Sequence, residues 1–277
     1  MVVIIVGAGG QLGQSFQFIA NDYPEIEFHF FSRSSLDITN KLNLEDVFKV
    51  LKPDFCVNAS AYTAVDKSES EPEQAHLINV EGVKNIAETC LNFKTTLIHI
   101  STDFVFDGNK NSPYTEEDET NPQGVYGKTK REGELEIIRI LKKYFIIRTS
   151  WLYSQFGNNF MKTMLKLAQD RDSLGVVNDQ IGSPTHAVDL ANVIVKVILS
   201  SSTNYGIYHY SNEGKASWYD FAKEIFEVNN IKINLKPIST AEFPTPAKRP
   251  KYSVLDKTKI KKEFNILIEE WQDSLKK

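Results

Sequence analysis

The sequence predicts an α/β fold, a doubly wound parallel sheet with a smaller C-terminal lobe. Two observations support this prediction. Short apolar runs alternate with helical repeats through residues 1–150, which is the order that right-handed βαβ units require. A glycine-rich turn directly follows the first apolar run, as in sheets of the Rossmann type. We therefore expect residues 1–150 to form a dinucleotide-binding Rossmann domain and residues 151–277 a smaller lobe interleaved with it.

The first half of the chain supplies most of the expected sheet. Residues 2–6 form a continuous β-branched run, typical of a strand that is covered on both faces. Leu12, Phe16 and Ile19 recur at helical spacing and predict a helix over residues 11–20. The other predicted elements here are strands at 26–31, 55–58, 96–101 and 144–149, and helices at 41–51, 71–93 and 126–143.

The elements after residue 150 are shorter. The proline-rich residues 239–250 are interpreted as an ordered loop, because two short helical stretches still follow them. The predicted elements of this half are helices at 160–168, 187–199 and 218–228, and strands at 173–177 and 206–210.

Composition excludes several classes of protein. The chain has 277 residues and a formal net charge of −4, without the basic bias that attracts nucleic acid. Its apolar N-terminal run is too short to cross a bilayer and lacks the basic region of a signal peptide. Only two cysteines occur, Cys56 and Cys90, which favours a reducing cytoplasm. The histidines show no ligand spacing with one another or with cysteine, so we expect no metal site.

The glycine turn carries the first functional signal. Gly7, Gly10 and Gly13 stand three residues apart, in the pattern GxxGxxG. Glycine permits positive φ and lets a pyrophosphate approach the backbone, and the following helix offers free amides at its N-terminus. This pattern directly after a buried strand predicts a dinucleotide site.

The end of the second strand indicates which dinucleotide binds. Ser32 and Arg33 stand where an acidic residue would bind the adenosine ribose, and no carboxylate is present. Arg33 could pair with a 2′-phosphate, so we predict NADPH, with NADH as the alternative. A solvated surface arginine is the other interpretation of Arg33. Asp37 and Ile38 stand where the chain next meets the adenine, although a simple turn and helix cap explains them equally well.

A second functional signal lies between residues 101 and 130. Tyr126 and Lys130 are four residues apart, which on a helix places both side chains on one face. The Lys130 ammonium is then expected to lower the pKa of the Tyr126 phenol. Thr102, at the end of a strand, would hold a carbonyl oxygen against Tyr126. The three residues predict a site that delivers a proton to a developing alkoxide, with the dinucleotide as the source of hydride.

Several longer motifs resemble the extended short-chain dehydrogenase/reductase family, and within it the dTDP-4-dehydrorhamnose reductase branch. The resemblance covers nearly the whole chain. The motifs that carry it are GAGGQLG at 7–13, NASAYTAVDKSESEP at 58–72, STDFVFDG at 101–108, YGKTK at 126–130, RTSWLY at 148–153, NDQIGSPT at 178–185 and RPKYSVLD at 249–256. It implies NAD(P)H-dependent reduction of the C4 ketone of dTDP-4-dehydro-6-deoxy-L-mannose to dTDP-L-rhamnose, with a nucleotide sugar as the partner.

The resemblance also implies a role for each motif residue. Tyr126 would be the proton donor, Lys130 its activator and a ribose ligand, and Thr102 the hydroxyl on the substrate carbonyl. Asp103 would hold a sugar hydroxyl. The implied cofactor contacts are Gly10, Gln11 and Leu12 on the phosphates, Asp37 and Ile38 on the adenosine, and Ala61, Tyr62 and Thr63 beside the nicotinamide.

Two further residues are implied substrate ligands of the C-terminal lobe. Trp151 would line the sugar pocket, and Arg249 would grip the nucleotide diphosphate as a planar bidentate donor. A core aromatic and a surface salt bridge are the respective alternatives. Ser15 and Val188 stand where some members carry acids of a metal-linked subunit contact. This departure predicts no bound metal and leaves a homodimer open.

Two other functions compete with simple reduction. An epimerase would hold NAD tightly and return the hydride to the same sugar. Thr102 is followed by Asp103 rather than by the Asp-Glu pair typical of a dehydratase, which favours reduction. A non-catalytic NADP-binding subunit, like the regulator of methionine adenosyltransferase, is the second alternative. Intact Thr102, Tyr126 and Lys130 argue against it.

Overall fold

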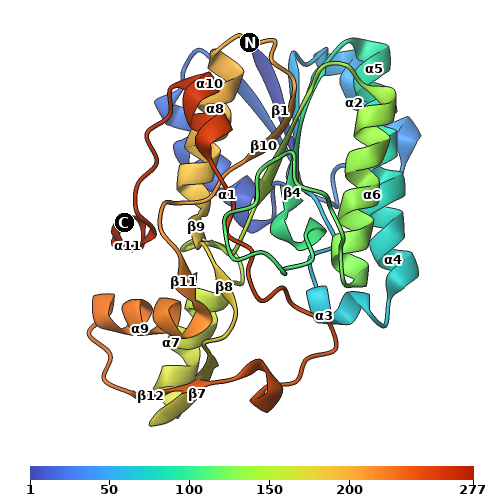
Figure 1. Ribbon diagram of the computed structural model, residues 1–277. Helices are drawn as coiled ribbons and strands as arrows, with labels where there is room; N and C mark the ends of the chain where they lie inside the picture. The colour runs from blue at the N-terminus through green and yellow to red at the C-terminus, as the bar shows by residue number, and fades with distance from the viewer.

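A six-stranded parallel sheet forms the centre of the computed structural model, which describes residues 1–277 (Figure 1). The strands follow the order β10-β5-β4-β3-β1-β2, and every neighbouring pair is parallel. Their bounds are β1 (Val2–Val6), β2 (Glu27–Phe31), β3 (Phe55–Asn58), β4 (Thr96–Thr102), β5 (Tyr144–Thr149) and β10 (Gly206–His209). The predicted doubly wound sheet is confirmed.

Helices cover both faces of this sheet, as Figure 1 shows. One layer consists of α2 (Lys41–Leu51), α5 (Val83–Phe93) and α6 (Val125–Ile140), and the opposite layer of α1 (Gln11–Ile19), α8 (Ala187–Leu199) and α10 (Thr258–Phe264). The first layer packs on the sheet through buried residues such as Phe48, Ile86 and Ile137. The second layer packs on the other face through Phe16, Leu190 and Ile194. Each helix turns one apolar stripe to the sheet, which is why the helical periodicities could be recognised in the sequence.

The predicted helix at 71–93 is the least regular element of the first half. It begins as α4 (Pro72–His76), continues through a π-helical segment at Leu77–Gly82, and ends as α5. The π-helical segment brings the backbone close to α6, where a methyl group on Gly133 would lie 2.2 Å from the Asn79 carbonyl oxygen. The sequence contains no signal for this change of helical pitch, because the change depends on close packing against the neighbouring helix α6.

The smaller lobe is built from pairs of short strands and their helices. The pairs are β7 (Ser173–Val177) with β12 (Asn234–Ile238), β8 (Ile181–Gly182) with β11 (Ala216–Ser217), and β6 (Leu152–Tyr153) with β9 (Thr185–His186). The helices are α7 (Phe160–Asp170), α9 (Trp218–Val228) and α11 (Trp271–Ser274), while the four-residue helix α3 (Val65–Ser68) belongs to the first half. The two-residue strands and β12 were not predicted, because they are too short or too polar to show the alternation of apolar and polar residues that marks a strand.

Residues beyond 150 are divided between the two regions. β10 pairs with β5 at the edge of the large sheet, and α8 and α10 cover that sheet. In Figure 1, α7, α9, β7 and β12 lie together below the sheet. The chain therefore crosses between sheet and lobe several times after residue 150.

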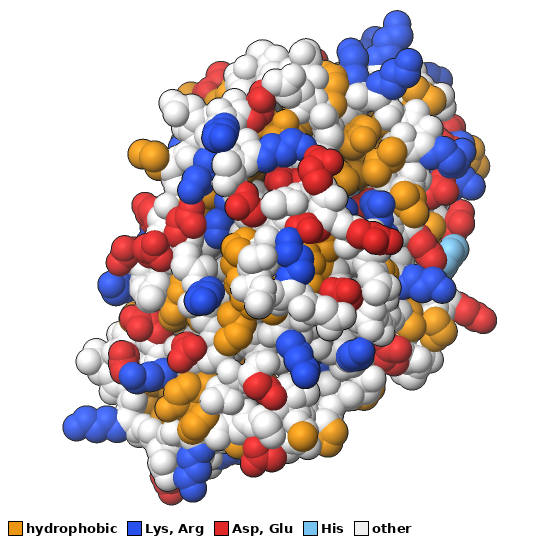
Figure 2. Space-filling view, in the orientation of Figure 1, with side chains coloured by type: hydrophobic (Ala, Val, Ile, Leu, Met, Phe, Trp, Pro, Cys, Tyr) orange, Lys and Arg blue, Asp and Glu red, His pale blue; other side chains and the backbone are white.

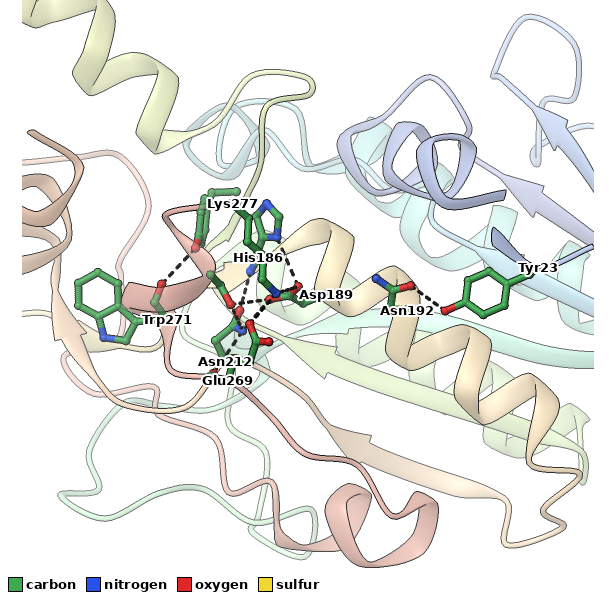
Figure 3. Close-up of polar contacts among 10 residues, drawn as sticks. Tyr23, His186, Asp189, Asn192, Asn212, Glu269, Trp271 and Lys277 are labelled. Atoms are coloured by element: carbon green, nitrogen blue, oxygen red, sulfur yellow. Dashed lines mark hydrogen bonds and ion pairs between the residues drawn. The ribbon is translucent and has the colours of Figure 1, made fainter. Parts of the chain in front are cut away.

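The end of the chain is fastened to the start of α8 (Figure 3). Asp189 accepts hydrogen bonds from Lys277 Nζ at 2.6 Å, Ser274 Oγ at 2.5 Å and Asn212 Nδ2 at 3.0 Å. Burial raises the pKa of the Asp189 carboxyl, but His186 and these three donors outweigh that effect and lower it. The C-terminus is thus held by a charged cluster rather than by apolar packing alone.

The surface shows no single-sign patch in the view of Figure 2, where basic and acidic side chains are interspersed. None of the helices combines the length and the apolar character needed to span a membrane.

Candidate active site

A cavity of about 930 Å³ opens where the carboxyl ends of the sheet strands meet the smaller lobe. This is the place where open α/β sheets bind ligands. The predicted site residues that line it are Gly7, Gly10, Gln11, Leu12, Arg33, Asp37, Ile38, Ala61, Thr63, Thr102, Asp103, Tyr126, Lys130, Trp151 and Arg249. Gly13, Ser32 and Tyr62 do not line it.

The glycine turn forms one end of the cavity. Gly7 has a φ of +89°, and a methyl group on it would lie 2.6 Å from the Ser60 nitrogen. No side chain caps α1, so the first amides of the helix, at Gln11 and Leu12, remain for a ligand. Gly13 serves a different purpose, because a methyl group there would lie 2.4 Å from the Ala8 Cα. It permits close packing of α1 on the turn and does not reach the cavity.

The end of β2 presents a free cation. Arg33 is exposed, lines the cavity and takes part in no ion pair. The Ser32 hydroxyl lies 2.8 Å from that of Ser34, outside the lining. Asp37 forms a turn through Oδ1, which accepts from the Thr39 backbone nitrogen at 2.9 Å, so its turn role and its place on the cavity coexist.

Ala61 and Thr63 face the cavity, whereas Tyr62 points away from it. The Tyr62 hydroxyl donates to Glu71 Oε2 at 2.7 Å, and its backbone nitrogen donates to Asn79 Oδ1 at 2.8 Å. The Tyr62 side chain therefore does not line the cavity, and its contact with the cofactor stays a prediction. Asn79 lies in the π-helical segment and holds the backbone of residue 62 in place.

Thr102, Asp103 and Tyr126 meet at the end of β4. The Thr102 hydroxyl donates to Asp103 Oδ1 at 3.0 Å, and the Phe104 ring packs edge-on against Tyr126 with centroids 5.6 Å apart. Burial, with a smaller contribution from the Asp103 charge, raises the pKa of Tyr126 to about 12, against the opposing effect of the Thr102 hydroxyl. The expected lowering of the Tyr126 pKa is wrong, because burial outweighs any effect of Lys130. The phenol stays protonated at neutral pH.

Asp103 is the most unusual carboxyl of the cavity. It is buried, and its Oδ2 has no hydrogen-bond partner. Burial raises its pKa to about 6, against the opposing effect of the nearby Ser253 and Thr102 hydroxyls. A buried acceptor without a partner is costly unless a ligand supplies a donor.

Lys130 lies on the cavity floor, where it is buried. Its Nζ donates to the Ile100 carbonyl oxygen at 2.7 Å and lies 3.1 Å from His99 Nε2. Burial lowers the pKa of Lys130 to about 8, and Glu134 acts in the opposite direction. A minor part of the lysine population is therefore neutral at pH 7, and the ammonium gives up its proton more easily than an exposed lysine does.

Two tryptophans form the wall on the side of the lobe. The Trp151 and Trp218 rings stack with centroids 3.5 Å apart and an interplanar angle of 8°. Trp151 has a φ of +46°, a strained value for a large side chain. A methyl group on Gly182 would lie 2.6 Å from the Trp151 ring, so only glycine fits behind it.

Arg249 reaches the cavity while it is paired to another residue. Its Nη1 and Nη2 donate to the two oxygens of Asp66 at 2.9 Å and 2.7 Å. The salt bridge considered as the alternative is present, and Arg249 also lines the cavity.

Comparison with known proteins identifies the family. The family model described as RmlD substrate binding domain matches residues 1–277. The chain is 44% identical over 285 residues to the dTDP-4-dehydrorhamnose reductase of Aggregatibacter actinomycetemcomitans, covering 99% of this chain and 97% of that protein. The chain belongs to the dTDP-4-dehydrorhamnose reductase family.

Solved structures of dTDP-4-dehydrorhamnose reductases share the whole fold. The one from Clostridium acetobutylicum is 45% identical, with a TM-score of 0.95, and the match covers 100% of this chain and 97% of that one. The Bacillus anthracis structure, in complex with NADP, is 41% identical with a TM-score of 0.95 and covers 99% and 96% of the two chains. The likeness therefore includes both the sheet and the lobe.

Several functional candidates of this member of the reductase family were missed from the sequence. Trp218 and Phe160 line the cavity, and His99 lies against Lys130. Gln11 was predicted as a cofactor contact, but its second connection, from the glycine turn to the lobe, was not: its Nε2 donates to the Leu152 carbonyl oxygen at 3.1 Å. Each of these residues acquires its place through contacts that are distant along the chain, so no local pattern marks it.

Proposed function

We propose that the protein reduces the C4 ketone of dTDP-4-dehydro-6-deoxy-L-mannose to dTDP-L-rhamnose, with NADPH as the source of hydride. The observation that carries this proposal is a single cavity lined by the glycine turn, Thr102, Tyr126 and Lys130. A hydride source and a proton donor must face one carbonyl, and this cavity brings the residues for both together. Relatives 33–44% identical to this chain carry the reductase name.

The residues at the glycine turn fit a dinucleotide phosphate. The first amides of α1 and its partial positive charge would hold the pyrophosphate. Arg33, which has no ion-pair partner, would pair with the 2′-phosphate of NADPH, and NADH would serve less well. When bound, the cofactor supplies the hydride.

The protein's own residues supply the proton. The Thr102 hydroxyl would hold the substrate carbonyl oxygen beside Tyr126. Because its pKa is about 12, Tyr126 carries the proton that the new alkoxide needs. Lys130, with a pKa of about 8, then restores that proton to the phenolate.

The substrate would lie between the end of β4 and the lobe formed within residues 151–277. The unpartnered Asp103 Oδ2 would accept a sugar hydroxyl, and the stacked Trp151 would form the wall of the sugar pocket. Arg249 would reach the diphosphate. We place the reaction in the cytoplasm, which agrees with two buried free cysteines.

The direct experiment follows NADPH consumption with dTDP-4-dehydro-6-deoxy-L-mannose and identifies the sugar by NMR. Stoichiometric NADPH oxidation and formation of dTDP-L-rhamnose are expected. An epimerase would instead carry NAD through purification and consume no NADPH. Failure to oxidise NADPH with this sugar, together with co-purification of a partner protein, would support the regulatory subunit and overturn the proposal.

Tyr126→Phe tests the proton donor. Removal of the phenolic proton should lower kcat by roughly 10²–10⁴-fold, the usual contribution of a positioned acid. The Kd of NADPH should stay unchanged, because the ring and its Phe104 contact remain. A variant that reduces the sugar at the wild-type rate would disprove the assignment.

A further inference from the structure

A chain of three buried polar side chains ends at the Lys130 ammonium. Asn58 on β3 and His99 on β4 are direct neighbours in the parallel register, and both are completely buried. Asn58 Nδ2 lies 3.1 Å from His99 Nδ1, and His99 Nε2 lies 3.1 Å from Lys130 Nζ. The hydrogen positions in this row of side chains follow from the contacts of Asn58, the residue farthest from Lys130.

The orientation of the Asn58 amide is fixed by Ser60. The Ser60 backbone nitrogen donates to Asn58 Oδ1 at 3.0 Å, and the Ser60 hydroxyl donates to the same oxygen at 2.6 Å. A backbone N–H can only donate, so a flipped amide would set two donors against each other. Asn58 Nδ2 must therefore face His99.

This orientation selects the tautomer of His99. The ring nitrogen that faces the Asn58 donor, Nδ1, has to accept, so the proton of the neutral imidazole is on Nε2. Burial and the charge of Lys130 both lower the pKa of His99, which keeps the ring neutral. The Nε2–H group then points at Lys130 Nζ.

The contact has opposite effects on the two forms of Lys130. A neutral amine has a lone pair that accepts the Nε2–H hydrogen bond, and it still donates to the Ile100 carbonyl. An ammonium has no lone pair and meets the Nε2–H group donor to donor. Resting on the proposed reduction, we propose that His99, oriented by Asn58, is a positioning residue that destabilises the Lys130 ammonium relative to the amine. The ammonium thereby becomes a readier proton donor to the Tyr126 phenolate.

The other ionisable groups near Lys130 are either paired with an opposite charge or are themselves residues of the proposed active site. Glu134 on the same helix favours the ammonium, but its carboxylate is shared with Arg148 at 2.7 Å and Arg131 at 2.9 Å. Asp103 and the phenol of Tyr126 complete the ionisable groups of this part of the cavity. His99 is the one that presents a donor to Nζ.

The tautomer can be observed without any turnover. Long-range ¹H–¹⁵N correlation spectra of the full-length protein distinguish Nε2–H from Nδ1–H imidazoles, with His99 assigned from the spectrum of His99→Phe. We expect the Nε2–H form for His99. An Nδ1–H form or an imidazolium at neutral pH would overturn the proposal, whether or not the protein reduces the sugar.

Asn58→Asp tests the consequence for the reaction. The carboxylate keeps an acceptor for Ser60 but turns the other oxygen to His99 Nδ1, which switches the ring to Nδ1–H and lets Nε2 accept from the ammonium. The wild-type kcat/KM should fall above about pH 8 as Lys130 loses its proton. In Asn58→Asp this limb should move up by about 1 pH unit, the size of shift a favourable neighbour gives. An unmoved limb in a variant with the switched tautomer would refute the proposal.

Two controls separate the tautomer from the added charge. Asn43→Asp adds the same charge on α2, where the Asn43 side chain makes no hydrogen bond and its backbone nitrogen donates to Asn40 Oδ1, and should keep the wild-type profile. In the His99→Phe background, Asn58→Asp has no ring through which to act, so the shift should be largely lost. A shift of equal size in that background would mean that the charge acts directly through space, and the proposed role of His99 would fail.

Discussion

Asp103 carries a charge where the protein leaves one carboxylate oxygen without a partner. Tyr126 and Lys130 lie in the same cavity. Burial raises the pKa of Asp103 and Tyr126 and lowers that of Lys130, so it favours the neutral form of each group. The enclosure therefore supplies an acid with its proton, an amine that can lose its proton, and a poorly solvated carboxylate. These are the properties that a ketone reductase needs from its side chains at neutral pH.

The pH dependence of stability reports on Asp103. Its folded pKa of about 6 lies above the unfolded value of about 3.9, so its contribution is present below pH 4 and is lost as the pH rises through 6. Asp103→Asn cannot ionise, so its free energy of unfolding relative to wild type should rise by about 2 kcal/mol between pH 4 and pH 7. Urea unfolding at both values measures this difference.

Asp107→Asn is the matched control. Hydrogen bonds from the Asn109 backbone and the Tyr114 hydroxyl lower the pKa of Asp107, so the sign is reversed. Its stability relative to wild type should fall as the pH rises from acid to neutral. The same trend in both variants would contradict the inferred burial of charge at Asp103.

At the scale of elements, short strands position the aromatic wall of the cavity. Gly182 in β8 lies directly behind the Trp151 ring, which stacks on Trp218 at the start of α9. The strand pair β8–β11 therefore fixes the depth of the proposed sugar pocket.

Gly182→Ala should displace this wall. The added methyl group lies 2.6 Å from the indole, so the ring must move. We expect KM for the nucleotide sugar to rise about tenfold, which is about 1.4 kcal/mol, with a changed near-UV circular dichroism spectrum and an unchanged Kd of NADPH. Gly175→Ala in β7, where the methyl group meets only the flexible Ile238 side chain, is the control. An unaltered KM and spectrum in Gly182→Ala would show that the wall does not shape the pocket.

The charged cluster at the C-terminus makes a separate prediction for α8 (Figure 3). Asp189→Asn removes the charge that Lys277, Ser274 and Asn212 share, and should destabilise the protein by about 1–3 kcal/mol, as for other hydrogen bonds to charged groups. Thermal unfolding measures the change. Lys276→Ala, which breaks only an exposed pair with Asp273, should leave the melting temperature unchanged. Equal effects of the two variants would contradict a specific role for the cluster.

At the scale of the whole molecule, one ion pair connects the loop after β12 to α3 in the first half of the chain. Arg249 and Asp66 are 183 residues apart in sequence and meet beside the cavity. The pair lowers the pKa of Asp66 and holds the guanidinium close to the proposed diphosphate site.

Arg249→Ala should separate substrate binding from cofactor binding. Loss of a bidentate donor to the diphosphate should raise KM for the nucleotide sugar by about 10- to 100-fold, since a hydrogen bond to a charged group contributes about 1.5–3 kcal/mol. Calorimetry should show an unchanged Kd for NADPH. Asp66→Asn keeps the arginine and should have a much smaller effect. If Asp66→Asn matched Arg249→Ala, the arginine would act through the loop rather than on the substrate.

Much of the fold and part of the cavity could be predicted from local patterns. The strands of the first half fall on apolar runs, and the helices fall on repeats that face the sheet, because each period reflects one buried face. The predictions were wrong or incomplete where a contact with a distant part of the chain decides the local structure. α6 ends at Ile140 instead of 143, and the Tyr62 side chain turns to Glu71 rather than to the cavity.

The sequence by itself determined the βαβ order, the glycine turn and the placement of Tyr126 and Lys130 on one helix, since each depends on residues within a few positions of one another. Only the tertiary structure decided that His99 and Asn58 reach Lys130, that Arg249 meets Asp66, and that β10 completes the sheet. These contacts join distant segments whose meeting is set by strand register and packing. Burial, which shifts the pKa values in the cavity, is likewise a property of the assembled protein and of no single motif.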